Sequence, residues 1–489
     1  MSLVHRRTVL RAGLAAAAGG LLSGCTGGAA DPATFMAPDG PEVRAAERKR
    51  NPGAVREMRL SAVAGPVDLG GPVVTTWSYG GLVPGGVARI KAGEVIRATL
   101  TNELPEHTTI HWHGLALRND ADGVPGVTQQ PVIPGAEHVY EFSAARPGTY
   151  WFHPHAGLQL DRGLYAPLIV EDPHEPLRYD AEWVVVLDDW LDGVGGRSPQ
   201  QQFGELREGA GGMMGGHMAG VGSSDLLGGD AGDVPYPYFL LNGRVPDSPV
   251  TFSGKPGSRV RLRIVNAAGD TAFRVALGGH QLTVTHADGF PVEPMQTDAV
   301  LIGMGERYDV LFTLADGVFP LVALAEGKDA TARGIVRTSS GAVPTASLLP
   351  RELYGEMIGY RRLRPAEAVR LPGRHIDRTI SLQLTGGMMS YEWAFDNRRF
   401  DPDHLIPIRF GERVRLMFTN ATMMWHPVHL HGHTFALGET GVRKDTAIVL
   451  PGQAVSAVFD ADNPGRWMVH CHNVYHAEAG MMTLLGYQR

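Results

Sequence analysis

The sequence predicts an all-β protein built from three β-sandwich domains. Its 489 residues are enough for about three domains of ordinary size. Glycine (63) and proline (34) are abundant, a composition typical of many short strands joined by turns. In addition, one turn-and-strand pattern occurs three times, with a domain length between copies.

The repeated pattern is a glycine-containing turn followed by a strand that ends at an asparagine. The copies run from Gly93 to Asn102, from Gly257 to Asn266 and from Gly411 to Asn420, and the glycine-to-asparagine separation is nine in each. A second pattern occurs only in the first and third units. There a Pro-Gly turn precedes a hydrophobic strand that ends in a histidine, at His153 and at His470. We therefore expect three related domains, with metal ligands only in the first and third.

These patterns give the expected organisation of the chain. A stretch rich in glycine and methionine, residues 209–224, is expected to form a loop of the second domain. The expected segments are a signal at 1–25, a linker at 26–50, a first domain at 51–175, a second at 176–345, a linker at 346–375 and a third domain at 376–489.

The N-terminus carries features of an export signal. Arg6 and Arg7 form a twin arginine, and the apolar stretch that follows is too short to span a bilayer. The sequence Leu22-Ser-Gly-Cys25 resembles a bacterial lipobox. We expect export by the twin-arginine route, cleavage before Cys25 and a lipid anchor as the only membrane attachment. The alternative is an ordinary cleaved signal.

Charge and cysteine content narrow the function further. The net charge is −7 and the chain has no basic patch, so nucleic-acid binding is excluded as a function. Cys25 and Cys471 are the two cysteines of the chain. If Cys25 is lipidated, no internal disulfide can form, and Cys471 would be open to oxidation outside the cytoplasm unless a metal occupies it.

Four His-x-His pairs are the main chemical signal in the sequence. Residues i and i+2 of a strand project to the same face, so each pair presents two imidazoles side by side. Imidazole suits copper, zinc, iron or nickel. The pairs are His111 and His113, His153 and His155, His429 and His431, and His470 and His472.

The C-terminal motif identifies the metal. Cys471, His476 and Met481 follow one another at the spacing C-x4-H-x4-M, and His426 lies upstream. Two imidazoles, one thiolate and one thioether make up a blue-copper electron-transfer site, whereas zinc does not favour the thioether. Because Cys471 stands between His470 and His472, a second centre can lie on the other side of the same strand.

These motifs resemble the four copper motifs of the multicopper oxidases. Segments away from them, such as 115–120, 227–232 and 323–328, are similar to the mycobacterial copper-resistance members of that family. The resemblance implies three cupredoxin-like Greek-key domains, four copper ions, and reduction of O2 to water. The ligands it implies are His426, Cys471, His476 and Met481 for type 1 copper, His111 and His429 for type 2, and His113, His153, His155, His431, His470 and His472 for the type 3 pair.

The proton-delivering acids depart from the family pattern. Many relatives carry an acid between the last two histidines of the C-terminal motif, whereas this chain has Asn473, Val474 and Tyr475. The other usual acid is present as Asp122. We therefore expect Asp122 and Glu478 to deliver protons, although the Asp-Gly sequence at Asp122 is also a turn signal.

The electron donor is the least determined part of the sequence prediction. Met424 and its neighbours offer thioethers beside His426, and thioethers favour Cu(I). In relatives that oxidise Cu(I), a methionine matching Met424 helps to bind it, although methionine also fills gaps in cores. We expect a Cu(I) oxidase for copper detoxification. The alternatives are a laccase-like phenol oxidase, a ferroxidase, or a non-catalytic copper carrier or store, against which the eight cluster histidines argue.

Overall fold

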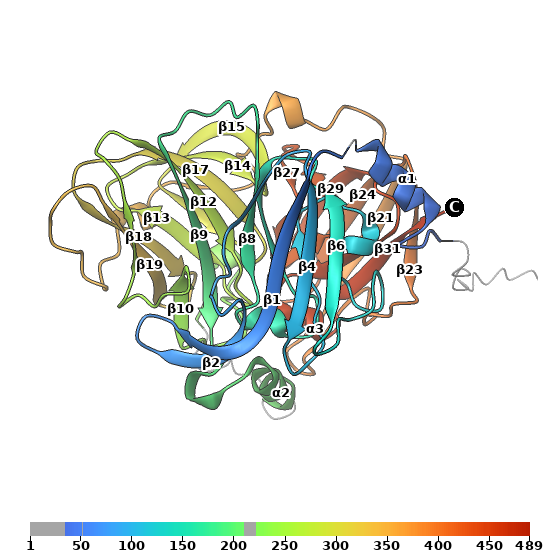
Figure 1. The fold of residues 1–489 in the computed structure, drawn as a ribbon, viewed down its shortest axis with the longest axis horizontal. Helices are drawn as coiled ribbons and strands as arrows, with labels where there is room; N and C mark the ends of the chain where they lie inside the picture. Colours follow the sequence, from blue (N-terminus) through green and yellow to red (C-terminus); the bar gives the residue numbers. More distant parts are fainter. Residues whose placement is uncertain (1–34, 51, 210–221) are drawn as a thin grey trace, which may run out of the picture.

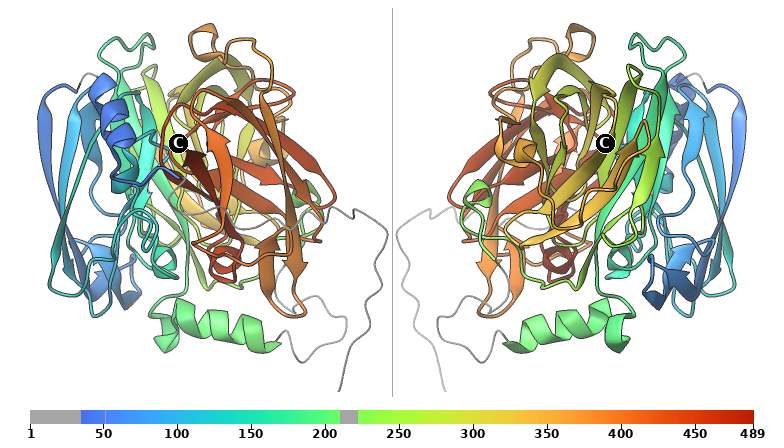
Figure 2. Two further views of the ribbon diagram at one scale, coloured as in Figure 1. Left: turned by 90° about the vertical axis from the view of Figure 1, so that its right-hand side faces the viewer. Right: turned by 90° about the vertical axis from the view of Figure 1, so that its left-hand side faces the viewer.

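The computed structural model describes residues 35–50, 52–209 and 222–489. The expected signal and most of the glycine- and methionine-rich stretch therefore lie outside the described residues. Figure 1 shows three groups of strands, with domain 2 (green to yellow) on the left, domain 3 (orange to red) on the right and domain 1 (blue to cyan) in front, and Figure 2 shows domain 1 to one side of the other two. Each group contains two sheets, so the prediction of an all-β protein with three sandwich domains is confirmed.

Domain 1 consists of two four-stranded sheets. Three of its four paired histidines lie on the second sheet, where β5 pairs with β7 and places His111 opposite His153, and His155 follows the end of β7. The strands of the first sheet are, in spatial order, β2 (Val73–Tyr79), β1 (Val55–Asp68), β4 (Val95–Glu103) and β6 (Glu137–Ser143); those of the second are β3 (Ala88–Lys91), β8 (Ala166–Glu171), β7 (Gly148–His153) and β5 (His111–His113).

Domain 2 consists of two six-stranded sheets. The last strand, β20, lies in the segment expected to be a linker and extends the second sheet beside β16. The first sheet contains β10 (Tyr238–Leu241), β9 (Ala181–Trp190), β12 (Arg259–Asn266), β17 (Arg307–Thr313), β14 (Leu282–Ala287) and β15 (Phe290–Thr297); the second contains β11 (Val250–Ser253), β19 (Ala330–Arg337), β18 (Val318–Ala325), β13 (Phe273–Leu277), β16 (Ala299–Ile302) and β20 (Met357–Ile358).

Domain 3 consists of a six-stranded and a five-stranded sheet. The smaller sheet carries the C-terminal motif, because β30 pairs with both β25 and β31. The larger sheet contains β22 (Glu392–Phe395), β21 (Arg378–Gly387), β24 (Arg413–Asn420), β29 (Ala454–Asp460), β26 (Phe435–Leu437) and β27 (Arg443–Lys444); the smaller contains β23 (Leu405–Arg409), β31 (Met482–Gln488), β30 (Arg466–Cys471), β25 (His426–Leu430) and β28 (Thr446–Val449).

The three copies of the sequence repeat occupy equivalent places. They form β4, β12 and β24, and in each domain the preceding long strand runs parallel to the repeat strand. The terminal asparagine of each copy donates from its side-chain amide to two backbone carbonyls and accepts from the backbone N–H two residues later. The asparagine recurs because it satisfies buried backbone groups where the chain leaves the strand.

The described helices are few and short. The first, α1 (Pro41–Lys49), lies in the segment expected to be a linker, where Met36 donates from its backbone to Tyr487 near the C-terminus. The second, α2 (Pro199–Gly209), lies below the β-domains (Figure 2). The third, α3 (Val474–Glu478), lies within the C-terminal motif. Among the described residues, no helix has the length and apolar character needed to cross a membrane.

Candidate metal centres

The residues of the C-terminal motif meet around one sulfur atom. His426 begins β25, Cys471 ends β30 and His476 lies in α3. The Sγ atom of Cys471 is 3.6 Å from Nδ1 of His426 and 3.7 Å from Nδ1 of His476, and the two Nδ1 atoms are 3.0 Å apart. All three side chains are fully buried. One thiolate and two imidazole nitrogens thus converge at the spacing a single metal ion needs.

The turn after Cys471 brings His476 back to this sulfur and the backbone of Met481 back to that of Cys471. Asn473 caps α3, because its side-chain oxygen accepts hydrogen bonds from the backbone N–H groups of Tyr475 and His476. Met481 is fully buried, and its backbone binds the other two residues: its N–H donates to His476 and its carbonyl accepts from Cys471, at 3.0 and 3.1 Å. The short helix explains the four-residue spacings of the motif.

Domain 2 contributes a carboxylate to this centre that the sequence analysis did not identify. The buried carboxylate of Asp233 lies 2.9 Å from Nε2 of His476 and accepts a hydrogen bond from the Tyr391 hydroxyl at 2.7 Å. Burial lowers the pKa of His476, but the hydrogen bonds to Asp233 and Cys471 outweigh it and raise the pKa to about 10. No motif in the sequence marks Asp233, since it acts across a domain interface.

The eight histidines of the four pairs form a second cluster between domains 1 and 3. The first pair lies on β5, whereas in each of the other three pairs the first histidine lies on β7, β25 or β30 and the second follows the end of that strand. The rings of His113 and His429 stack with their centres 3.8 Å apart. Three triads have ligand atoms within 4.8 Å of one another, which is close enough to share a metal ion: His111, His429 and His431; His111, His113 and His153; and His155, His431 and His470.

The hydrogen bonding of these rings fits a set of metal ligands. In most of them one ring nitrogen is fixed by a carbonyl or carboxylate, as in His153, whose Nδ1 lies 2.9 Å from the Pro154 carbonyl. The opposite nitrogen is buried and has no hydrogen-bond partner in the described structure, a pattern shared by Nε2 of His111, His153, His429 and His431. Buried polar atoms are rarely left without a partner, and one fixed nitrogen with one free nitrogen is the usual arrangement of a metal-binding histidine.

The electrostatics of the cluster favour neutral rings. Burial, followed by the mutual repulsion of neighbouring imidazoles, holds the pKa of six of them well below the usual value, which leaves them neutral at neutral pH. Neutral imidazole is the form that binds a metal. The six are His113, His153, His155, His431, His470 and His472.

Asp122 lies inside the cluster, between the two domains. Its carboxylate oxygens are 2.9 Å from Nδ1 of His431 and 3.2 Å from Nδ1 of His111, and its backbone carbonyl is 2.9 Å from Nδ1 of His111. The Asp-Gly sequence also forms a turn here. Gly123 has a φ of +80°, and a side chain at that position would overlap the Ile110 carbonyl. Asp122 therefore orients one ring from each domain, a role that the sequence analysis did not foresee.

Glu478 and Tyr475, both in α3, have different surroundings. Glu478 lines a cavity of about 170 Å³ together with His153, His155 and His472. The Tyr475 hydroxyl instead donates to the buried carboxylate of Asp161, which is not among the residues lining that cavity. Burial raises the pKa of Glu478. Of these two residues, Glu478 is the one placed beside the histidine cluster.

The adjacent methionines near His426 have opposite exposure. Met424, the residue expected to bind a substrate ion, is 6% exposed and belongs to the core, whereas Met423 is 85% exposed. Met389, on the turn between β21 and β22, is also 85% exposed. The sequence analysis selected Met424, whereas Met423 and Met389 are the ones of these three methionines whose thioethers are accessible.

Comparison with known proteins identifies the family. Multicopper oxidase family models match residues 65–175, 182–341 and 374–488. The chain is 50% identical over 429 residues to the multicopper oxidase MmcO of Mycobacterium tuberculosis, which covers 86% of this chain and 85% of that protein. The chain belongs to the multicopper oxidase family.

Other relatives agree with this assignment. Copper resistance protein A of Escherichia coli is 30% identical over 82% of this chain and 87% of its own length. The laccase of Botrytis aclada superposes with a TM-score of 0.75 at 27% identity, over 89% of this chain and 88% of that structure. The multicopper oxidase is thus a copper-dependent oxidoreductase with cupredoxin-like domains, and the family resemblance inferred from its sequence motifs is confirmed.

Proposed function

We propose that this multicopper oxidase couples one-electron oxidation of Cu(I) to the four-electron reduction of O2 to water. When bound, the copper ions supply one-electron redox chemistry and together hold the electrons that O2 needs. The proposed ligands are His426, Cys471, His476 and Met481 for type 1 copper, His111 and His429 for type 2, and His113, His153, His155, His431, His470 and His472 for the type 3 pair, which gives four copper ions in all.

The placement of Cys471 is the single observation that carries this proposal. Its sulfur faces His426 and His476, whereas the rings of its two sequence neighbours, His470 and His472, belong to the eight-histidine cluster. One strand end therefore serves both centres, and only a few backbone bonds separate them. A non-catalytic copper carrier or store would not need a cluster that binds O2.

Protons and O2 need access to the eight-histidine cluster, and we assign that role to the cavity beside α3. Glu478 lines it together with cluster histidines, and burial raises the pKa of its carboxyl group, so Glu478 holds its proton to a higher pH than an exposed glutamate. We propose Glu478 as the proton carrier. Asp122, hydrogen-bonded to rings from both domains, is proposed to orient the ligands and to pass protons to the cluster.

The choice of Cu(I) as donor rests on thioethers and on relatives. Met423 and Met389 are exposed and offer soft ligands at the surface, and Met424 is buried next to Met423 in the chain. Several relatives bear the name copper resistance protein A. Others are named laccases, so a phenol oxidase is the competing assignment.

Steady-state oxygen uptake with Cu(I), a phenol and Fe(II) tests the donor. We expect the largest kcat/KM for Cu(I). Met424→Leu keeps the volume and removes the sulfur, so it should lower kcat/KM for Cu(I) more than for the phenol. Met295→Leu, on β15 of domain 2, is the matched control and should change neither. A Met424→Leu enzyme with unchanged kinetics for both donors would assign Met424 to core packing alone.

We also propose that the protein acts outside the cytoplasm. Support comes from the twin arginine at Arg6 and Arg7 and from the lipobox-like sequence ending at Cys25. Export in the folded state would allow the cluster to form from a complete chain. The lipid on Cys25 would then be the only membrane attachment.

A further inference from the structure

Domain 2 supplies none of the proposed copper ligands, yet one of its loops lies directly against the eight-histidine cluster. The loop joins β16 to β17 and contains Gly305, whose φ is +82°. A β-carbon on Gly305 would lie 2.9 Å from Cδ2 of His472 and 3.0 Å from Cε1 of His113. The loop backbone therefore approaches one ring from domain 1 and one from domain 3 so closely that only glycine fits.

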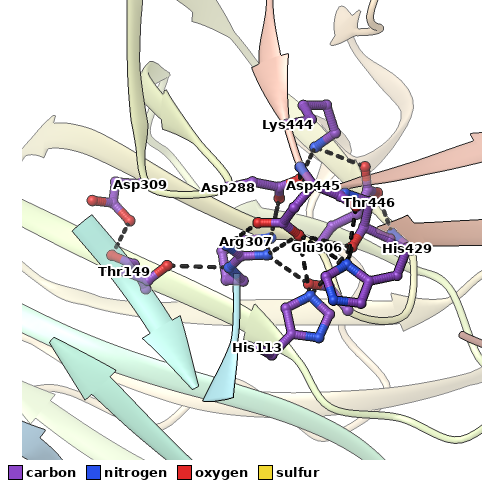
Figure 3. A network of polar contacts seen from close by, with 12 residues as sticks. His113, Thr149, Asp288, Glu306, Arg307, Asp309, His429, Lys444, Asp445 and Thr446 are labelled. Atoms are coloured by element: carbon purple, nitrogen blue, oxygen red, sulfur yellow. Dashed lines mark hydrogen bonds and ion pairs between the residues drawn. The ribbon is translucent and has the colours of Figure 1, made fainter. Parts of the chain in front are cut away.

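The arginine that follows this loop joins all three domains. Arg307, at the start of β17, is fully buried and binds both carboxylate oxygens of Asp445 in domain 3, at 2.7 and 2.6 Å (Figure 3). Its Nε also donates to the carbonyl of Thr149 on β7 of domain 1, at 3.1 Å. Gly114, which follows His113, leaves the space that the guanidinium occupies, since a side chain there would overlap it.

Asp445 in turn holds two of the cluster histidines. Its Oδ1 lies 3.1 Å from Nε2 of His113, and its backbone carbonyl lies 2.9 Å from Nδ1 of His429. Because Nε2 of His113 is bound to the carboxylate, Nδ1 is the nitrogen that faces the cluster, and it has no other hydrogen-bond partner in the described structure. In His111, His153, His429 and His431 the free nitrogen is Nε2 instead.

A second group of buried charged side chains holds the backbone around Asp445 in place. Lys444 lies 3.0 Å from Asp288 and 2.9 Å from Glu306, and all three are fully buried at the interface of domains 2 and 3 (Figure 3). Asp288 also accepts hydrogen bonds from the backbone N–H groups of Arg307 and Asp445. Both members of the Arg307–Asp445 pair are therefore held in position independently of the metal.

We propose that Arg307 is a positioning residue for the eight-histidine copper site: acting through Asp445, it fixes the ring of His113 and selects the nitrogen that faces the copper. Domain 2 thus controls copper occupancy of a site to which it contributes no ligand. The inference rests on the proposed ligand assignment. Residues that orient metal-binding histidines typically change metal affinity about 10- to 100-fold when they are mutated.

A purely structural role for Arg307 predicts a different result, and Arg261 provides the matched control. Arg261 is another buried arginine of domain 2 and binds Asp309 at 2.6 and 3.0 Å. It makes no hydrogen bond to a cluster histidine or to Asp445 in the described structure. Replacing either arginine with lysine disturbs a buried ion pair, but only the change at Arg307 should reach the copper site.

The test compares copper-loaded Arg307→Lys, Arg261→Lys and the parent protein at full length. Copper per chain, chelator competition and the type 1 and type 2 electron paramagnetic resonance signals are measured. We expect Arg307→Lys to keep the blue thiolate band and the type 1 signal, but to lose affinity for the remaining copper about 10- to 100-fold and to show an altered type 2 signal. Arg261→Lys should keep all four copper ions.

Equal copper retention in Arg307→Lys and the parent, or equal loss in both arginine variants, would overturn the positioning role. If Arg307→Lys fails to fold, the isosteric Asp445→Asn takes its place. Its amide can donate to Nε2 of His113 and move the ring proton to Nδ1, so it should show the same selective loss, and full occupancy would again overturn the proposal. A parent protein with no type 2 signal would instead refute the proposed function itself.

Discussion

Replacing Tyr475 with phenylalanine tests whether this residue, which stands where many relatives carry an acid, takes part in proton delivery. Its hydroxyl donates to Oδ2 of Asp161 at 2.5 Å, and Tyr236 donates to the other oxygen of the same carboxyl group at 2.7 Å. All three side chains are buried. Tyr475→Phe keeps the ring and leaves one buried carboxyl oxygen without its donor.

The expected cost follows from burial and from the charge of the acceptor. Burial, aided by the nearby Asp189, raises the pKa of Asp161 well above its usual value. The acceptor of the hydrogen bond that Tyr475→Phe removes is therefore not a permanently ionised carboxylate. Hydrogen bonds to charged groups contribute roughly 1.5–3 kcal/mol and neutral ones about 1 kcal/mol, so we expect a loss of about 2 kcal/mol. Tyr165→Phe is the control, since its hydroxyl donates to buried Asp188 at 2.5 Å.

Two assays separate stability from proton delivery. Urea unfolding of the copper-free proteins should show similar losses for Tyr475→Phe and Tyr165→Phe. Oxygen uptake per bound copper should be unchanged in both, because neither hydroxyl belongs to a residue that lines the cavity beside Glu478. Slower oxygen uptake at full copper content in Tyr475→Phe, with normal uptake in Tyr165→Phe, would refute this reasoning and assign the tyrosine to proton delivery.

The remaining predictions concern copper, pH and export. Cys471→Ser should abolish the blue colour and the oxidase activity, and a colourless, fully loaded parent protein would contradict the type 1 assignment. Burial alone would raise the pKa of Asp309, but two buried arginines outweigh it and hold the pKa well below its usual value. The stabilisation of the folded protein by ionised Asp309 is therefore complete above pH ~4 and is lost as pH falls. The difference in unfolding free energy between the parent and Asp309→Asn should become smaller below pH ~4. A difference that does not change with pH would contradict this. Cys25→Ala should release the protein from the membrane fraction, and lysine at both Arg6 and Arg7 should retain it in the cytoplasm; a membrane-bound Cys25→Ala protein would exclude the lipid anchor.

The sequence predicted those parts of the molecule in which neighbouring residues act together. The His-x-His pairs could be identified because the two histidines of each pair are sequence neighbours that lie on a strand or at its end, and the asparagine repeat because each copy satisfies its own strand end. Arg307 and Asp233 could not be identified in this way. Each acts on a residue more than a hundred positions away, and nothing in its local sequence shows that partner.

Adjacent residues in a turn mark another limit of the sequence prediction. Met423 and Met424 lie in bends before β25, where neither a period of two nor one of 3.6 applies. The turn closed by Asn420 directs one of them into the core and the other into solvent. Sequence alone indicated a methionine near the copper motif, but not which of the two is accessible.

The division of the proposed copper ligands between the first and third domains has a consequence for biosynthesis. The Nε2 atoms of His155 and His470 are 3.5 Å apart, although the two residues are 315 positions apart in sequence. At about 5–20 residues per second, roughly 15–60 s separate their emergence from a ribosome. During that interval the four histidines of domain 1 are present without the four of domain 3, so a metal ion that binds then is held by only half of the proposed site. Selection of copper over other metals therefore belongs to the finished chain, after its last β-strand has joined the sheet.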